Sequence, residues 1–102
     1  MRVRYLHVND RVYAAIEDIA AYIVSVSTPD HARMYTRQLL DEIRDLAYYG
    51  DGYPVSQYEM ARRYGLGAKI MTTKNKKWSI IFHTDDHFVY VEEILPSSMV
   101  TH

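Results

Sequence analysis

The final third of the chain contains three short apolar runs joined by two polar turns of four residues. The runs are Ala68–Thr73, Trp78–His83 and Phe88–Leu95. All three are rich in β-branched and aromatic residues, which favour strands. Because such short connections join antiparallel neighbours, the runs predict an antiparallel meander. Val89, Val91 and Leu95 in the last run indicate a central, buried strand, which we expect Pro96 to end.

Two amphipathic helices are predicted before this meander. The first has apolar residues at three- and four-residue steps, Ile16, Ile19, Ala20, Ile23 and Val24, after a cap at Asn9 or Asp10. The second has the stripe Ala32, Tyr35, Leu39, Leu40, Ile43, Leu46 and Ala47. It begins at Thr28-Pro29-Asp30, which combines a capping hydroxyl, a proline and an acidic residue. We expect Gly50 to end it in the left-handed conformation, and the short break to produce an antiparallel hairpin.

The predicted fold class follows from the order of these elements. Residues 3–8 form a further short strand by composition, so the order is β-α-α-β-β-β. We therefore expect an α+β fold with the helical hairpin on one face of a curved, largely antiparallel sheet, which the first strand completes. Residues 51–67 predict a long connection with a helical turn near residues 57–63. The length of 102 residues suits a single domain over residues 1–102.

Composition excludes several classes of protein. Apolar residues at 48% and charged residues at 25% are typical of a globular chain and exclude general disorder. The absence of cysteine excludes disulfides and thiolate chemistry. The sequence has neither a signal-peptide pattern nor an apolar run long enough to span a membrane. We therefore expect a soluble, cytoplasmic protein.

Charge is distributed unevenly although the formal net charge is only −1. The segment 62–77 contains no acidic residue and carries Arg62, Arg63, Lys69, Lys74, Lys76 and Lys77. Such a strip can neutralise phosphates or face an acidic partner, and it can equally be the solvated end of a hairpin. We select Arg62, Arg63, Lys69, Lys76 and Lys77 as candidate target- or phosphate-binding residues. The arginine pair is the stronger candidate, because guanidinium groups bind phosphate or carboxylate in a planar fork.

Several stretches of this order resemble the RelE/ParE superfamily of bacterial type II toxins. They are the helix Ile16–Val24, the helix start Pro29–Ala32, the spacing Leu39/Ile43/Leu46, and the strand segments Lys77–His83, Phe88–Val91 and Ile94–Met99. The resemblance covers nearly the whole chain. It implies a RelE/ParE-like fold and a toxin that inhibits growth, serves plasmid stabilisation and is neutralised by a cognate antitoxin.

The resemblance implies one of two targets. RelE-like members cleave messenger RNA on the ribosome without a metal ion, whereas ParE-like members inhibit DNA gyrase by binding. The RelE-like route uses basic or aromatic residues at the C-terminus, where this chain has Ser97-Ser98-Met99. We therefore favour a ParE-like, non-enzymatic toxin. A RelE-like endoribonuclease and a degenerate, non-toxic binding module stay open as alternatives. Tyr64 and His83 are weak catalytic candidates.

Two further patterns have competing interpretations. The segment His83–His87 contains metal-ligand residue types, but Asp-Asp between two apolar strands is typical turn chemistry. We predict a turn there, with no metal and no cofactor. Five tyrosines that follow the second helix, Tyr48, Tyr49, Tyr53, Tyr58 and Tyr64, favour an interface over a simple cover for the helices. We also expect an apolar groove beside the hairpin that the antitoxin fills, and self-association of the free protein as a homodimer through that groove.

Overall fold

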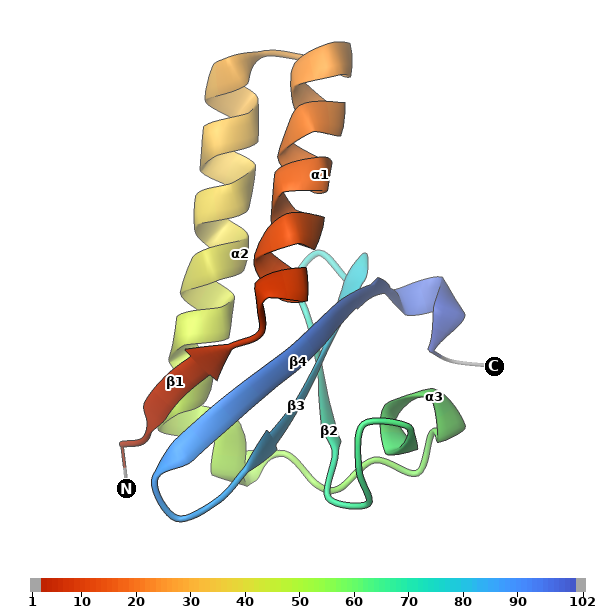
Figure 1. The fold of residues 1–102 in the computed structure, drawn as a ribbon. Coiled ribbons are helices and arrows are strands. Elements are labelled where there is room, and N and C mark those ends of the chain that lie inside the picture. Colours follow the sequence, from red (N-terminus) through yellow and green to blue (C-terminus); the bar gives the residue numbers. More distant parts are fainter. Residues whose placement is uncertain (1–2, 101–102) are drawn as a thin grey trace.

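The computed structural model describes residues 3–100 as two long helices and a twisted sheet (Figure 1). The helices are α1 (Asp10–Val26), α2 (Pro29–Tyr49) and the short α3 (Glu59–Arg62). The strands are β1 (Tyr5–Val8), β2 (Lys69–Thr72), β3 (Trp78–Thr84) and β4 (Phe88–Pro96). Two 3₁₀ turns, η1 (Gly50–Gly52) and η2 (Ser97–Met99), follow α2 and β4. None of the helices in residues 3–100 has the length and apolar character needed to cross a bilayer.

The sheet has the strand order β1-β4-β3-β2. Strands β2, β3 and β4 pair antiparallel, as the two short turns predict, and β1 joins β4 in parallel. The α1–α2 hairpin carries the chain across the sheet from β1 to β2 at the other edge, and β2 and β3 follow before β4 pairs with β1. The predicted α+β class and element order are confirmed, and β4 has the central position expected for it.

The helix starts are set by side-chain caps. The Asn9 side chain accepts a hydrogen bond from the Arg11 amide at 3.0 Å, and Thr28 Oγ1 accepts one from the His31 amide at 3.1 Å. The predicted left-handed cap at Gly50 is wrong, since Gly50 has a right-handed φ of −57° and continues into η1. The physical reason is hydrogen bonding. Gly50 is buried, and its carbonyl accepts hydrogen bonds from the Tyr53 amide at 3.3 Å and from Lys69 Nζ at 3.2 Å, which hold it in the continuing turn.

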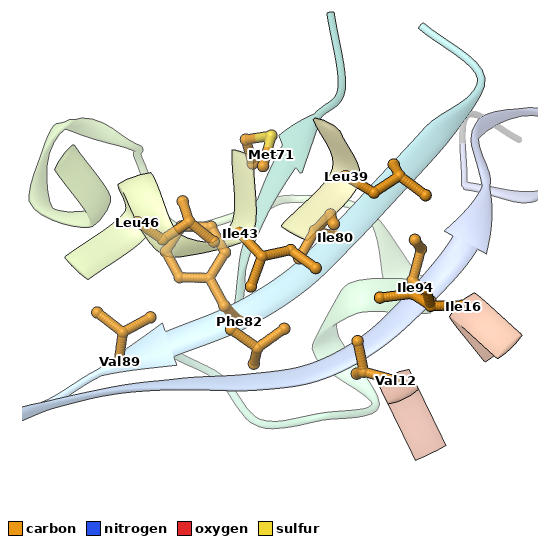
Figure 2. Packing of buried hydrophobic residues seen from close by; sticks show 11 residues of the cluster. Val12, Ile16, Leu39, Ile43, Leu46, Met71, Ile80, Phe82, Val89 and Ile94 are labelled. Atoms are coloured by element: carbon orange, nitrogen blue, oxygen red, sulfur yellow. The ribbon is translucent and has the colours of Figure 1, made fainter. Parts of the chain in front are cut away.

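The main core lies between the hairpin and one face of the sheet, and Figure 2 shows its side chains. It consists of Val12, Ile16, Leu39, Ile43, Leu46, Met71, Ile80, Phe82, Val89, Val91 and Ile94. Val24 belongs to the predicted α1 stripe but is 46% exposed, whereas Val12 is fully buried. The far end of the hairpin extends past the sheet, so Val24 near the end of α1 stays exposed although its neighbour Ile23 is buried (Figure 1).

A β-bulge changes the facing of residues along β4. Phe82 pairs with Val91, but Ile81 pairs with Glu93, so Glu92 is the additional residue in β4. Val89 and Val91 face the helices before the bulge, and Ile94 does so after it. Uninterrupted alternation would put Leu95 on the face of Val91, but Leu95 packs in a second cluster. The extra residue shifts the two-residue alternation by one position.

The second cluster lies on the sheet face that points away from α1 and α2, called the open face below. Ala61, Ala68 and Ile81 are its buried members, with Tyr64, Ile70 and Leu95 packed against them. The connection that includes α3 therefore covers one part of the open face. This helical turn lies where residues 57–63 predict one.

Candidate functional site

The predicted basic residues are distributed over three places. Arg62 and Arg63 are exposed at the end of α3, while Lys76 and Lys77 are exposed in the turn between β2 and β3. In Figure 1, α3 lies near the start of β2, and that turn follows the other end of the strand. The tertiary structure therefore separates the arginine pair from the lysine turn.

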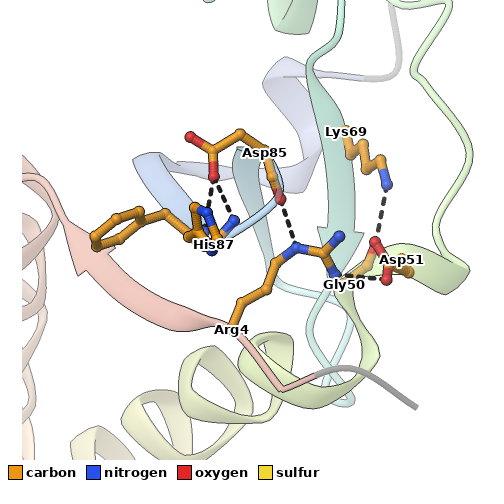
Figure 3. Close-up of polar contacts among 7 residues, drawn as sticks. Arg4, Gly50, Asp51, Lys69, Asp85 and His87 are labelled. Carbon is orange, nitrogen blue, oxygen red and sulfur yellow. Dashed lines mark hydrogen bonds and ion pairs between the residues drawn. The ribbon is translucent and has the colours of Figure 1, made fainter.

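Lys69 departs from our expectation that it shares a face with the arginine pair. It pairs with Phe82 in the β2–β3 register, which places both on the helix-facing side of the sheet. Its Nζ donates a hydrogen bond to the Gly50 carbonyl at 3.2 Å (Figure 3). The Lys69 ammonium therefore helps to hold the end of α2 against the edge strand.

Arg4 links three segments at the same end of the sheet (Figure 3). Its Nε donates to the Asp85 carbonyl at 2.6 Å, and its Nη1 forms an ion pair with Asp51 at 2.5 Å. The side chain is only 11% exposed. These bonds join the start of β1 to η1 and to the β3–β4 turn, so they position the strands that carry the open face.

The open face carries a cluster of aromatic rings that the sequence analysis did not select. The β1–β4 and β3–β4 registers place five rings side by side there, namely Tyr5, His7, His83, Phe88 and Tyr90, called the aromatic patch below. His83 stacks on Tyr90 with ring centroids 4.8 Å apart and planes inclined by 19°. Tyr90 also lies 5.9 Å from His7 and 5.6 Å from Phe88. The patch is thus continuous across three strands.

Much of the aromatic patch is accessible to solvent. Tyr5 is 74% exposed, and Phe88 is 37% exposed although it is a large apolar residue on a central strand. The α3 connection packs on Ile81, Ala68 and Leu95, so it covers another part of the face. Contiguous exposed rings of this kind are typical of interaction surfaces.

Carboxylates border the aromatic patch. Asp85 Oδ2 accepts a hydrogen bond from the Tyr90 hydroxyl at 2.8 Å, and Glu92 Oε1 lies 3.9 Å from His83 Nε2. The nearby Arg4 is engaged by Asp51 and by the Asp85 carbonyl. The Asp85 and Glu92 carboxylates therefore give the border of the patch negative charge. An anionic transition state requires cations placed against it.

The two catalytic candidates have different partners on the open face. The Tyr64 hydroxyl donates to Glu93 Oε2 at 3.2 Å, and the Arg11 guanidinium lies 5.8 Å from the Tyr64 ring centroid. Burial and the Glu93 carboxylate raise the pKa of Tyr64 above its usual value, although Arg11 and Arg63 act in the opposite direction. A phenol with a raised pKa is a poor general base near neutral pH. The His83 ring, in contrast, stacks on the Tyr90 ring.

The five tyrosines in the last turn of α2 and in the connection after it divide between packing and exposure. Tyr53 packs edge-on against Phe82 at 5.6 Å between ring centroids, and Tyr64 packs on the second cluster. Tyr48, Tyr49 and Tyr58 are exposed. An interface therefore remains a prediction for the three exposed tyrosines, whereas Tyr53 and Tyr64 pack within the protein.

An apolar groove of about 410 Å³ lies between the far end of the hairpin and the start of β3. Its apolar lining is formed by Ile19, Tyr22, Ile23, Val26, Tyr35 and Trp78. Tyr22 and Val26 are more than 60% exposed, at 67% and 63%. The Tyr35 hydroxyl accepts hydrogen bonds from Trp78 Nε1 at 2.8 Å and Asn75 Nδ2 at 2.9 Å, which fix the floor of the groove. Lys77 and His31 supply its polar margin.

Asp85 caps the β3–β4 turn and gives a prediction for acid stability. Its Oδ1 accepts hydrogen bonds from the His87 and Phe88 amides, each at 2.8 Å, which hold the pKa of Asp85 below its usual value. A lowered folded-state pKa contributes stability above the unfolded value of about 3.9, and this contribution is lost as pH falls toward the folded value. In Asp85→Asn, the free energy of unfolding should therefore fall less steeply than in the parent as the pH drops below about 4.

Urea unfolding at a series of pH values measures this effect. An asparagine oxygen can still accept the two amide hydrogen bonds, so the fold should persist. Asp18→Asn, an exposed change on α1, is the control. If the free energy of unfolding fell equally steeply at acid pH in the parent and in Asp85→Asn, the stabilising role of the Asp85 carboxylate would be contradicted.

Comparisons with known proteins agree with this architecture. No protein-family model matches the chain, and no curated protein sequence matches it. A solved structure described as "Chromosomal ParDE TA system from P. aeruginosa" contains a chain that superposes with a TM-score of 0.76. The match covers 92% of this chain and 96% of that chain at 14% sequence identity. At this identity the likeness is one of fold, and the predicted RelE/ParE-like arrangement is confirmed.

Proposed function

We propose that the chain is the toxin of a bacterial type II toxin–antitoxin module, and that it acts by binding its target rather than by cleaving RNA. The target class is DNA gyrase, as for ParE-like toxins. The observation that carries the toxin proposal is the fold match to a ParDE system over nearly the full length of both chains. The acidic border of the aromatic patch supports the non-enzymatic mode, because RNA cleavage on those rings would need cations against the phosphate.

The groove beside the hairpin is the proposed antitoxin site. Its lining is mainly apolar and its floor is fixed by the Tyr35 hydrogen bonds, so an amphipathic helix or a strand could fill it without rearrangement. The groove and the open face lie on different sides of the sheet. An antitoxin in the groove would therefore leave part of the open face accessible.

Expression in growing cells, with and without the neighbouring reading frame, tests the toxin proposal. We expect growth arrest that the neighbouring frame relieves. Purified protein should inhibit gyrase supercoiling and leave messenger RNA intact in a translation reaction. Ribosome-dependent RNA cleavage would replace the binding mode with the RelE-like one, and unaffected growth would refute the toxin proposal itself.

A matched pair of variants tests the groove. Tyr22→Asp places a charge in the groove and should weaken antitoxin binding by at least about 30-fold, the effect of an interface hot spot of 2 kcal/mol. Tyr13→Asp makes the same change on α1 outside the groove lining and should bind as the parent does. Equal affinities for the two variants, measured by calorimetry, would remove the groove from the interface.

Arg62 and Arg63 are the remaining candidates for contact with an anionic group of the target. Replacing both with lysine keeps the charge and removes the planar fork, whereas alanine removes both. If the pair forms a specific site, neither double variant should arrest growth. If the pair acts only through its charge, the lysine variant should still arrest growth and the alanine variant should not. Growth arrest in cells without the antitoxin is the measurement. Parental behaviour of both variants would exclude the pair, because two solvated side chains contribute little.

A further inference from the structure

Within residues 3–100, no lysine or arginine stacks on the rings of the aromatic patch, although such cations normally accompany a nucleic-acid stacking surface. Surfaces that bind single-stranded nucleic acid combine aromatic rings with a positively charged path for the backbone. The patch has the rings, but its border consists of the carboxylates of Asp85 and Glu92. Its charge therefore opposes a phosphate backbone and favours a cation.

We propose that the aromatic patch is a docking site for an arginine-bearing, basic segment of a partner protein. A guanidinium group stacks on aromatic faces and pairs with carboxylates through its planar fork. Tyr5 and Phe88 lie with ring centroids 5.8 Å apart and offer exposed rings, and Glu92 lies on the other side of the patch near His83. An arginine side chain has an apolar plane that can stack on the exposed rings and a positive charge that can pair with the carboxylates.

The carboxylates are held in place before any partner arrives. Asp85 accepts two backbone amides and the Tyr90 hydroxyl, and these bonds fix its orientation. Glu92 lies on the open face with Tyr90 by strand alternation, and the β4 bulge places the neighbouring Glu93 on that face too. Arg4 fixes the β3–β4 turn through the Asp85 carbonyl. Such preorganisation lowers the cost of ordering side chains on binding.

The proposal is independent of toxicity, because the test measures binding alone. The ¹⁵N-labelled full chain is titrated with a blocked pentapeptide that contains two arginines and, separately, with the same peptide carrying citrulline in place of arginine. Citrulline keeps the shape of the side chain and removes its charge. A single-stranded hexanucleotide is the third probe. We expect the arginine peptide to shift amide resonances of the patch strands, and the citrulline peptide to bind at least about tenfold more weakly.

Three variants locate the site. Tyr5→Ser and Glu92→Gln should each weaken binding of the arginine peptide by about 2-fold to 5-fold. Tyr13→Ser removes an exposed tyrosine of α1 that lies outside both the patch and the groove lining, and should leave the affinity unchanged. Tyr5 and Glu92 lie outside the buried core, so both variants should fold, and their spectra show it directly.

Several results would overturn the proposal. Equal binding of the arginine and citrulline peptides would do so. So would an arginine peptide that shifts no amide resonances, or only resonances away from the patch. Binding of the hexanucleotide to the patch strands would also do so. Concentration-dependent shifts of the patch without any peptide would instead assign it to self-association. Growth assays have no part in this test, so its failure and that of the toxin proposal are distinguishable.

Discussion

Replacing Ile43 with alanine is expected to lower the free energy of unfolding by about 2–5 kcal/mol. Ile43 is 1% exposed on α2, and in Figure 2 its side chain points toward Ile80 and Phe82 of β3. Truncation removes buried apolar atoms and leaves a cavity that the rigid sheet cannot close. Urea unfolding followed by circular dichroism measures the change.

The control for this variant is Val24→Ala. Val24 belongs to the predicted apolar stripe of α1 but is 46% exposed at the projecting end of the hairpin. Its truncation should change the free energy of unfolding by no more than about 0.5 kcal/mol. An Ile43→Ala variant as stable as Val24→Ala would disprove the packing of α2 on the sheet.

Replacing Gly65 with alanine should cost about 1–3 kcal/mol of stability. Gly65 has a φ of +124°, a conformation that a residue with a Cβ rarely adopts. It closes the turn after α3, where its amide donates to the Arg62 carbonyl and its carbonyl accepts from the Ala68 amide. Strain there should loosen the cover of the second cluster, and thermal unfolding reports it.

Gly67→Ala is the matched control two residues away. No atom lies within 4 Å of a Cβ at Gly67, and its φ is not positive. A glycine-to-alanine change at such a position stabilises by about 0.4–1 kcal/mol, because the unfolded chain has fewer conformations. If Gly65→Ala matched this gain, the strained turn would not exist in solution.

Much of the fold could be predicted because the apolar periodicity and the capping residues indicated the same helices. The stripe that contains Leu39, Ile43 and Leu46 faces the sheet, and Thr28 caps α2, since both depend on contacts within a few residues. The end of α2 could not be predicted. The Gly50 carbonyl is bound by Lys69, a residue of a distant strand, and such a contact is absent from the local pattern.

The candidate site was predicted much less well than the fold. Lys69 was grouped with Arg62 and Arg63 by proximity in sequence, but its register with Phe82 turns it toward the helices. The aromatic patch was missed because its rings come from three strands. The alternation of Tyr5 with His7, and of Phe88 with Tyr90, was visible in the sequence, but their adjacency depends on a parallel β1–β4 pairing.

The sequence by itself determined the order of elements, their types and the helix faces that are buried, because periodicity and capping act within one or two turns. The tertiary structure decided which residues meet on the open face. The chain passes through the hairpin, β2 and β3 before β4 comes to lie beside β1, and the bulge at Glu92 directs consecutive glutamates to the same side. Strand register and bulges arise from contacts between distant segments, so the local sequence does not contain them.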